Sequence, residues 1–170
     1  ILFILITTHT FAASNLQLQL GVFQSDYFKS AAKYTISYEI MQRSGLAFEI
    51  GTTMMQSAKA TQDLTQTTLP FAGFKYYFRL PRLPFRLFFG AGFGLNHIPK
   101  VYGTNYIGTN LSSGMSYHIS PYNFIYAKYQ MDYGQTLNNG NAISFDGNTI
   151  SIGIAMSLSK NKGQKAQRKR

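Results

Sequence analysis

Apolar side chains alternate with small or polar ones along eight separate segments of this sequence. Alternation with period two is the pattern of a β-strand, whose successive side chains point to opposite faces. No charged residue occupies an apolar position in any of the eight segments. The apolar side chains stand at every second position of residues 16–22, 34–40, 46–50, 74–78, 85–93, 107–117, 125–131 and 150–158, and Thr109 and Ser113 are the two polar exceptions on this face.

The composition of the two faces decides which kind of β-protein this is. The solvent face of a soluble sandwich would carry many Lys and Glu, whereas the opposing face here is mostly Gly, Ser, Thr and Gln. Charged residues make up only 13% of the chain, against about 25% in soluble domains. No run of about 20 apolar residues exists to form a membrane helix. The sequence therefore predicts an all-β, eight-stranded antiparallel up-and-down transmembrane β-barrel, closed so that no edge is exposed.

The connections between the predicted strands alternate between short and long. Outer-membrane barrels have short periplasmic turns and longer extracellular loops, so this asymmetry predicts the bacterial outer membrane with both termini in the periplasm. The short connections are residues 42–45, 80–84 and 119–123; the four predicted outer loops are residues 24–33, 55–69, 96–105 and 134–147.

Both ends of the sequence differ in composition from the predicted barrel, which we assign to residues 14–159. Residues 1–13 join an apolar run to small residues, which is typical of a secretory signal peptide and its cleavage site. We expect a signal-peptide remnant truncated at its start; a first buried strand is the alternative. Residues 160–170 hold six basic residues and no acidic one. We expect a disordered periplasmic tail there, with binding to anionic lipid or nucleic acid as the alternative.

Charged residues on the polar faces of the strands are predicted to point into the barrel. A buried charge left alone costs several kcal/mol, so these residues should pair. We expect Glu49 to contact Lys75 or Lys128, and Glu39 to contact Arg79 or Arg86. We interpret the set as structural, plugging a lumen that only just admits side chains; a gated ion path is the alternative. The full set is Glu39, Glu49, Lys75, Arg79, Arg86, Lys128 and Asp132.

Aromatic residues and glycines complete the prediction. Glycines on the inward faces, such as those of residues 90–94, are expected to make room for the bulky Tyr77, Phe88 and Tyr126.

Amphipathic tyrosine rings favour the headgroup level of a membrane, so outward tyrosines predict interfacial girdles; ordinary core tyrosines are the alternative. The predicted girdle residues are Tyr34, Tyr76, Tyr117, Tyr129 and Tyr133.

Catalytic and metal sites find little support in the sequence. His118 and Ser120 share one strand face and Asp132 follows on the next strand, which suggests a Ser–His–acid hydrolase. The acid is expected near the opposite end of its strand, on the order of nine residues away at ~3.3 Å each. The sequence has no cysteine, and its histidines are scattered. We therefore predict no enzyme, no metal and no cofactor.

The pattern resembles the small outer-membrane barrel superfamily typified by the OmpA transmembrane domain and the OmpX/Ail adhesins. Residues 89–95, which read FGAGFGL, look like the Gly/aromatic fifth strand common there. Such proteins end on an aromatic residue, whereas this chain has Leu158 followed by the basic extension. The sequence is also similar in strand count to the barrel lipid A deacylases, which carry His-x-Ser on the seventh strand. Residues 127–134 contain neither His nor Ser.

This resemblance implies a monomeric integral membrane protein in contact with outer-membrane lipid and lipopolysaccharide. The outer loops, rich in Thr, Gln and Asn, and the lack of a credible catalytic site predict a structural or adhesion-type role through the four loops, where an extracellular ligand would bind. We expect no nucleic-acid partner. A lipid A-modifying enzyme or a narrow pore is the alternative function.

Overall fold

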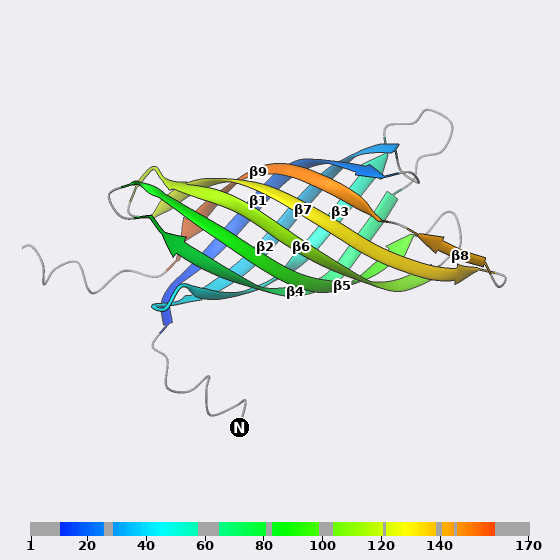
Figure 1. Cartoon of the computed structure of the whole chain (residues 1–170), viewed down its shortest axis with the longest axis horizontal. Helices are drawn as coiled ribbons and strands as arrows, with labels where there is room; N and C mark the ends of the chain where they lie inside the picture. Colours follow the sequence, from blue (N-terminus) through cyan, green and yellow to red (C-terminus); the bar gives the residue numbers. More distant parts are fainter. Residues whose placement is uncertain are drawn as a thin grey trace, which may run out of the picture.

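A computed structural model describes residues 11–25, 29–57, 65–80, 83–98, 104–120, 122–138, 141–144 and 146–158. Within these residues no helix is long and apolar enough to cross a membrane. The chain forms nine strands (Figure 1): β1 (Phe11–Ser25), β2 (Lys29–Gln42), β3 (Leu46–Ser57), β4 (Thr65–Arg79), β5 (Phe85–Ile98), β6 (Thr104–His118), β7 (Asn123–Asn138), β8 (Asn141–Ser144) and β9 (Gly147–Ser157).

Eight of these strands close into a barrel. Each strand from β1 to β7 pairs antiparallel with the next one in sequence. β9 pairs with both β7 and β1, which closes the wall. The short β8 pairs only with the last residues of β7, and this hairpin extends past one end of the barrel (Figure 1). The predicted eight-stranded antiparallel barrel is confirmed.

The two ends of the barrel differ. At the end that we call the turn end, β2, β4 and β6 connect to the next strand, β1 begins and β9 ends. The opposite end is called the loop end. The turn between β2 and β3 closes with a hydrogen bond from the Gly45 amide to the Gln42 carbonyl (3.1 Å). Gly45 adopts a φ of 96°, a left-handed conformation that glycine takes without steric cost.

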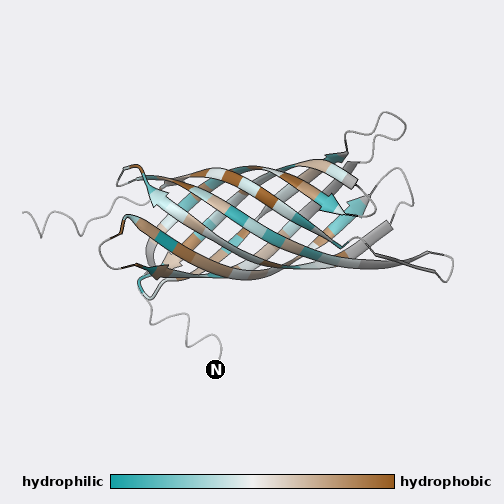
Figure 2. Ribbon diagram, turned by 45° about the horizontal axis from the view of Figure 1, so that its top comes forward, coloured by the Kyte–Doolittle hydropathy of each residue, from teal (hydrophilic) through white to brown (hydrophobic). Residues whose placement is uncertain are grey.

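Side chains alternate between the two surfaces of the wall as the sequence predicted. Outward apolar residues remain largely exposed to the barrel's surroundings, with Ile107 at 71% and Ile150 at 70%. Residues between them point inward and are mostly buried, and this alternation is visible along the ribbons in Figure 2. Within the described strands, no charged residue shares the outward parity of the apolar side chains. The wall therefore presents an uncharged band suited to lipid.

The strands reach further toward the loop end than predicted. The predicted loop bounds 24–33, 55–69, 96–105 and 134–147 are wrong, because β-pairing continues into all four segments. Gln24 pairs with Ser30, and Met55 pairs with Gln66, well inside the first two segments. The backbone ladder continues there although the hydropathy alternation fades. Hydropathy reports where a strand contacts lipid, not where its hydrogen bonding stops.

The structure leaves the predictions for the two ends of the chain untested. β1 begins at Phe11, and Ala13 pairs with Met41 of β2, so the end of the expected signal segment is in register with the wall. Residues 1–10 and 159–170 lie outside the described residues. The signal segment and the basic tail are therefore still predictions.

Candidate functional site

The interior of the barrel holds a buried cluster around Lys75. Lys75 comes from β4, and its Nζ lies 3.0 Å from Glu49 Oε2 and 3.3 Å from Glu39 Oε2. The same ammonium donates a hydrogen bond to Gln17 Oε1 (3.2 Å). Glu39 and Glu49 are direct partners on β2 and β3. One lysine thus bridges two carboxylates that would otherwise face each other without a cation between them.

Neutral donors complete the Lys75 cluster. Glu39 accepts hydrogen bonds from Asn15 Nδ2 (3.1 Å) and from the Tyr77 hydroxyl (2.8 Å), and it is 0% exposed. Glu49 accepts a hydrogen bond from the Ser37 hydroxyl at 2.5 Å. Each buried carboxylate thus accepts hydrogen bonds from more than one donor, which offsets the free-energy cost of burying its charge.

The Lys75 cluster matches one expected contact and corrects the other. Glu49 meets Lys75, one of the two partners expected for it. The expected contact of Glu39 with Arg79 or Arg86 is wrong, because Glu39 pairs with Lys75 instead. Barrel strands are tilted, so an inward side chain meets residues that the register places beside it rather than those at the same sequence distance from a turn.

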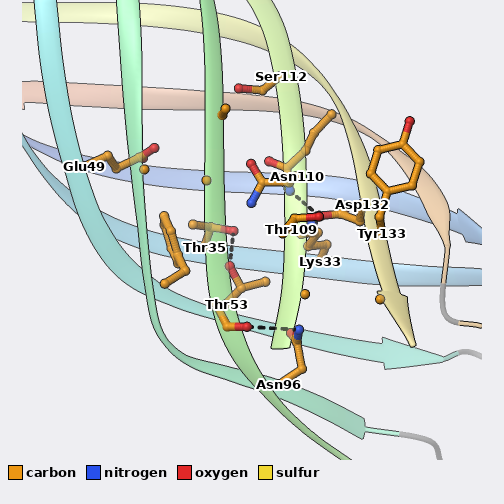
Figure 3. Close-up of a pocket in the computed structure, with 18 of the residues that line it drawn as sticks. Lys33, Thr35, Glu49, Thr53, Asn96, Thr109, Asn110, Ser112, Asp132 and Tyr133 are labelled. Carbon is orange, nitrogen blue, oxygen red and sulfur yellow. Dashed lines mark hydrogen bonds and ion pairs between the residues drawn. The ribbon is translucent and has the colours of Figure 1, made fainter. Parts of the chain in front are cut away.

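A second ion pair crosses the barrel nearer the loop end (Figure 3). Lys33 Nζ of β2 lies 2.8 Å from Asp132 Oδ2 of β7, two strands that are not neighbours in the wall. The Thr149 hydroxyl of β9 accepts from Lys33 (3.2 Å) and donates to Asp132 (3.1 Å). Gln130 Nε2 also donates to Asp132 at 2.5 Å. This bridge ties β2, β7 and β9 together through the lumen.

Sequence reasoning missed Lys33 because it lay in the predicted loop 24–33. A usable signal was present: Lys33 continues the inward parity of Thr35 and Ser37 along β2. The Thr35 and Thr53 hydroxyls are 3.0 Å apart in the same region of the lumen (Figure 3).

Lys128 is the third buried lysine of the lumen. It is 7% exposed, and its ammonium makes no hydrogen bond or ion pair with the described residues. It lines a cavity of about 60 Å³ together with Lys33, Glu49 and Asp132. That volume admits at most a few water molecules, which would complete the hydration of the ammonium.

An apolar layer separates the Lys75 cluster from the turn end. Phe88 is 1% exposed, and its ring lies 5.4 Å from that of Tyr77. Glycines make the room for these rings, but they are not the expected ones of residues 90–94: a Cβ at Gly114 would meet the Phe88 ring, and one at Gly153 would meet the Tyr126 ring. A Cβ at Gly90 or Gly92 would instead meet a carbonyl oxygen of β4. The apolar layer consists of Met41, Ala47, Tyr77, Phe88, Phe124, Tyr126 and Ala155.

The remaining predicted charges lie at the turn end. Arg79 and Arg86 are direct partners on β4 and β5; Arg79 is exposed and Arg86 half-buried. Neither forms an ion pair within the described part of the chain.

The residues of the considered hydrolase triad lie apart. The His118 ring stacks near Phe124 at the turn end (5.4 Å). The Ser120 hydroxyl accepts hydrogen bonds from the Tyr122 and Asn123 amides, as a turn-capping serine does. Asp132 is bound to Lys33 at the other end of β7. Among the described residues, no group of three or more His, Cys, Asp or Glu is placed to hold a metal.

All five predicted girdle tyrosines point outward and are exposed, so they are not core residues. Tyr76 and Tyr117 lie near the turn end, and Tyr34 and Tyr133 lie nearer the loop end. Tyr129 donates a hydrogen bond to Asn148 Oδ1 (2.8 Å) on the same outer surface. Their placement at the membrane interface remains a prediction.

Comparison with known proteins concerns the fold. No protein-family model and no curated protein matches the sequence. Among solved structures, neisserial surface protein A is similar with a TM-score of 0.64 and 21% identity over 85% of this chain and 96% of that one. The N-terminal β-barrel domain of Pseudomonas aeruginosa OprF is similar with a TM-score of 0.61 and 14% identity over 88% of this chain and 100% of that one.

A de novo designed transmembrane β-barrel is also similar, with a TM-score of 0.58 and 14% identity over 86% of this chain and 96% of that one. A designed chain with this architecture shows that the architecture alone does not specify a biological role. The natural neighbours agree with the closed β-barrel wall described above. The chain has the fold of the small eight-stranded outer-membrane β-barrels.

Proposed function

We propose that this protein is a sealed, non-enzymatic barrel of the bacterial outer membrane, whose loop end serves as a surface for interaction. The observation that carries the proposal is the filling of the lumen at successive levels. The apolar layer around Phe88 lies beside the Lys75 cluster, and the Lys33–Asp132 bridge lies beyond it. A barrel filled in this way supports its wall rather than conducting solute.

The outer surface supports a location in a membrane. Its exposed side chains are Leu, Ile, Phe, Tyr and Met in the middle of the strands, without charge in the described part. A water-soluble barrel with such a surface would aggregate. The outer membrane is the membrane in which barrels of this kind reside, and the likeness to neisserial surface protein A supports the same location.

The arrangement of titratable groups favours a structural role over lipid A hydrolysis. A Ser–His–acid mechanism needs its three groups within hydrogen-bond reach of one another. Asp132 lies eight positions along β7 from Phe124, the residue that pairs with His118. Eight strand residues span about 26 Å, so Asp132 cannot orient His118.

The proposed interaction surface lies at the loop end, where strands continue beyond the apolar band and the β7–β8 hairpin projects (Figure 1). We assign the loop end to the extracellular side and both termini to the periplasm, with the barrel acting as a monomer among lipid and lipopolysaccharide. An extracellular ligand would meet the strand extensions and the short connections between them.

Two measurements test the sealed outer-membrane barrel. The full chain, expressed in a Gram-negative host, should fractionate with outer membranes and change electrophoretic mobility on boiling. Reconstituted into planar bilayers, it should show no steady porin-like conductance, and Phe88→Ala should introduce current because it removes the most deeply buried ring of the apolar layer. Steady conductance of the unaltered chain would overturn the sealed state, and recovery in the soluble fraction would overturn the location.

Orientation is tested with cysteines, because the chain has none of its own. Gln24 is exposed at the loop end and Ser44 is exposed in the turn between β2 and β3. Gln24→Cys should react with a membrane-impermeant maleimide on intact cells, whereas Ser44→Cys should react only after the outer membrane is opened. The opposite labelling pattern would invert the proposed topology.

A further inference from the structure

The turn end of the barrel holds a cavity of about 710 Å³. The proposed function, a sealed barrel that interacts through its loop end, gives this cavity no role. This size falls within the range of small-molecule sites, about 300–1,000 Å³. Among the described residues, no carboxylate lines the cavity, whereas three arginines and one histidine do: Arg43, Arg79, Arg86 and His118. We call it the basic vestibule.

Two of the arginines face each other without a counter-charge. Arg79 and Arg86 are direct cross-strand partners on β4 and β5, and like charges at such positions repel. The hydrogen-bond partner of Arg86 in the described chain is the Met41 sulfur, at 3.9 Å, which is a weak acceptor.

The acidic residues of the lumen cannot compensate this charge. Glu39 is the acidic residue whose attraction reaches Arg86, but it is 0% exposed and both its oxygens already accept hydrogen bonds from Asn15, Lys75 and Tyr77. Tyr77 and Phe124 of the apolar layer also line the vestibule and close its inner side. The vestibule is therefore a basic cup that opens toward the turn end.

We propose that the basic vestibule is a binding site for a phosphate-class oxyanion, held by the paired guanidinium groups of Arg79 and Arg86. Guanidinium groups bind phosphate oxygens through two parallel hydrogen bonds, and a pair of them satisfies several oxygens at once. Arg43 adds positive charge at the rim, and the Ser120 and Tyr122 side chains lining the cavity add hydroxyl groups.

This inference goes beyond the proposed function and holds in whichever membrane the barrel resides. The same chemistry fits a soluble phosphate compound and the phosphate of a phospholipid headgroup. The test separates the two sources by using two probes on the full chain folded in octyl glucoside, a detergent without phosphate. Backbone and guanidinium NMR signals of Arg79 and Arg86 are followed during titration with inorganic phosphate or with a short-chain phosphatidylglycerol, against chloride at equal ionic strength.

A saturable shift with inorganic phosphate identifies a soluble oxyanion, and a shift with phosphatidylglycerol alone identifies a headgroup. In either case Arg79→Gln/Arg86→Gln should weaken binding by about tenfold or more, because charge-assisted hydrogen bonds are lost. The affinity of Arg79→Lys/Arg86→Lys should lie between that of the unaltered chain and that of the glutamine variant, because lysine keeps the positive charge but not the planar guanidinium group. Mobility on unboiled gels shows whether each variant is folded. If the glutamine double variant does not fold, the lysine double variant is used in its place to test the site.

Lys29→Gln is the matched control, because it removes one positive charge at the loop end, where β2 begins. It should leave the affinity of either probe unchanged. The proposal is overturned if neither probe produces a saturable shift, if Arg79→Gln/Arg86→Gln binds as well as the unaltered chain, or if Lys29→Gln weakens binding equally.

Discussion

Glu39 and Glu49 face each other directly across β2 and β3, and the Lys75 ammonium lies within 3.3 Å of a carboxylate oxygen of each. Like charges at opposed positions of a sheet repel. Here the shared cation converts the repulsion into a link among three adjacent strands. The two carboxylates and the lysine therefore form one unit, and removing one member leaves the others uncompensated in the lumen.

Lys75→Met is expected to destabilise the folded barrel by about 3–5 kcal/mol, because it leaves two buried carboxylates without a cation. Urea unfolding of the barrel in lipid vesicles, followed by circular dichroism, measures the change. Glu39→Gln and Glu49→Gln added to Lys75→Met should restore most of the loss. Lys75→Met with an unchanged urea midpoint would contradict the shared-cation arrangement.

Asp132→Asn is expected to lower the free energy of unfolding by less than Lys75→Met does, about 1–3 kcal/mol. The Asp132 side chain is 23% exposed, and Gln130 and Thr149 would still contact the asparagine. The stability lost by Asp132→Asn should be smaller in concentrated salt, because salt screens the partly exposed Lys33–Asp132 pair more than a fully buried pair. The same urea titrations at low and high salt check this. A loss from Asp132→Asn that is larger than that of Lys75→Met would show that the ranking is wrong.

Gly153→Ala is expected to destabilise the barrel by about 1–3 kcal/mol through overpacking. The added Cβ would meet the Tyr126 ring and the carbonyl oxygen of Leu18. Tyr126→Leu in the Gly153→Ala background should recover part of the loss, because it relieves the ring contact and leaves the carbonyl contact. Gly153→Ala that unfolds at the same urea concentration as the unaltered chain would show that the wall yields more easily than its packing indicates.

Ile152→Lys is expected to cost about 2–4 kcal/mol in vesicles, the cost of a cation near the middle of the lipid-facing surface. Ile152 is 67% exposed on the outward face, midway along β9. Gln24→Lys near the loop end is the matched control, and it should cost about 0–1 kcal/mol because it lies near the interface. Equal costs for the two substitutions would argue against a lipid-facing band centred on residues such as Ile152.

The face of each strand residue could be read from the sequence. Ile152 was expected outside and Lys75 inside, and both lie there. Parity is a local property, because consecutive side chains of a strand must point to opposite sides whatever the rest of the chain does. Parity also indicates that inward glycines make room for Tyr126 and Phe88, but not that Gly153 and Gly114, rather than the glycines of residues 90–94, lie beside these rings.

Strand lengths and interior partners required the tertiary structure. The ladder of β2 continues past the point where hydropathy alternates, so Lys33 was placed in a loop although it reaches Asp132 across the lumen. Glu39 was assigned to the wrong cation for a related reason: strand tilt and closure of β9 onto β1 decide which inward residues meet.

The sequence by itself determined that this chain folds into an eight-stranded barrel with an uncharged outside, since alternation and the placement of charge are written residue by residue. Only the tertiary structure decided that Lys75 joins Glu39 to Glu49 and that Arg79 faces Arg86 without a counter-charge. Those relations join residues on neighbouring strands, and the register that brings them together is set by strand pairing, which the hydropathy pattern does not report.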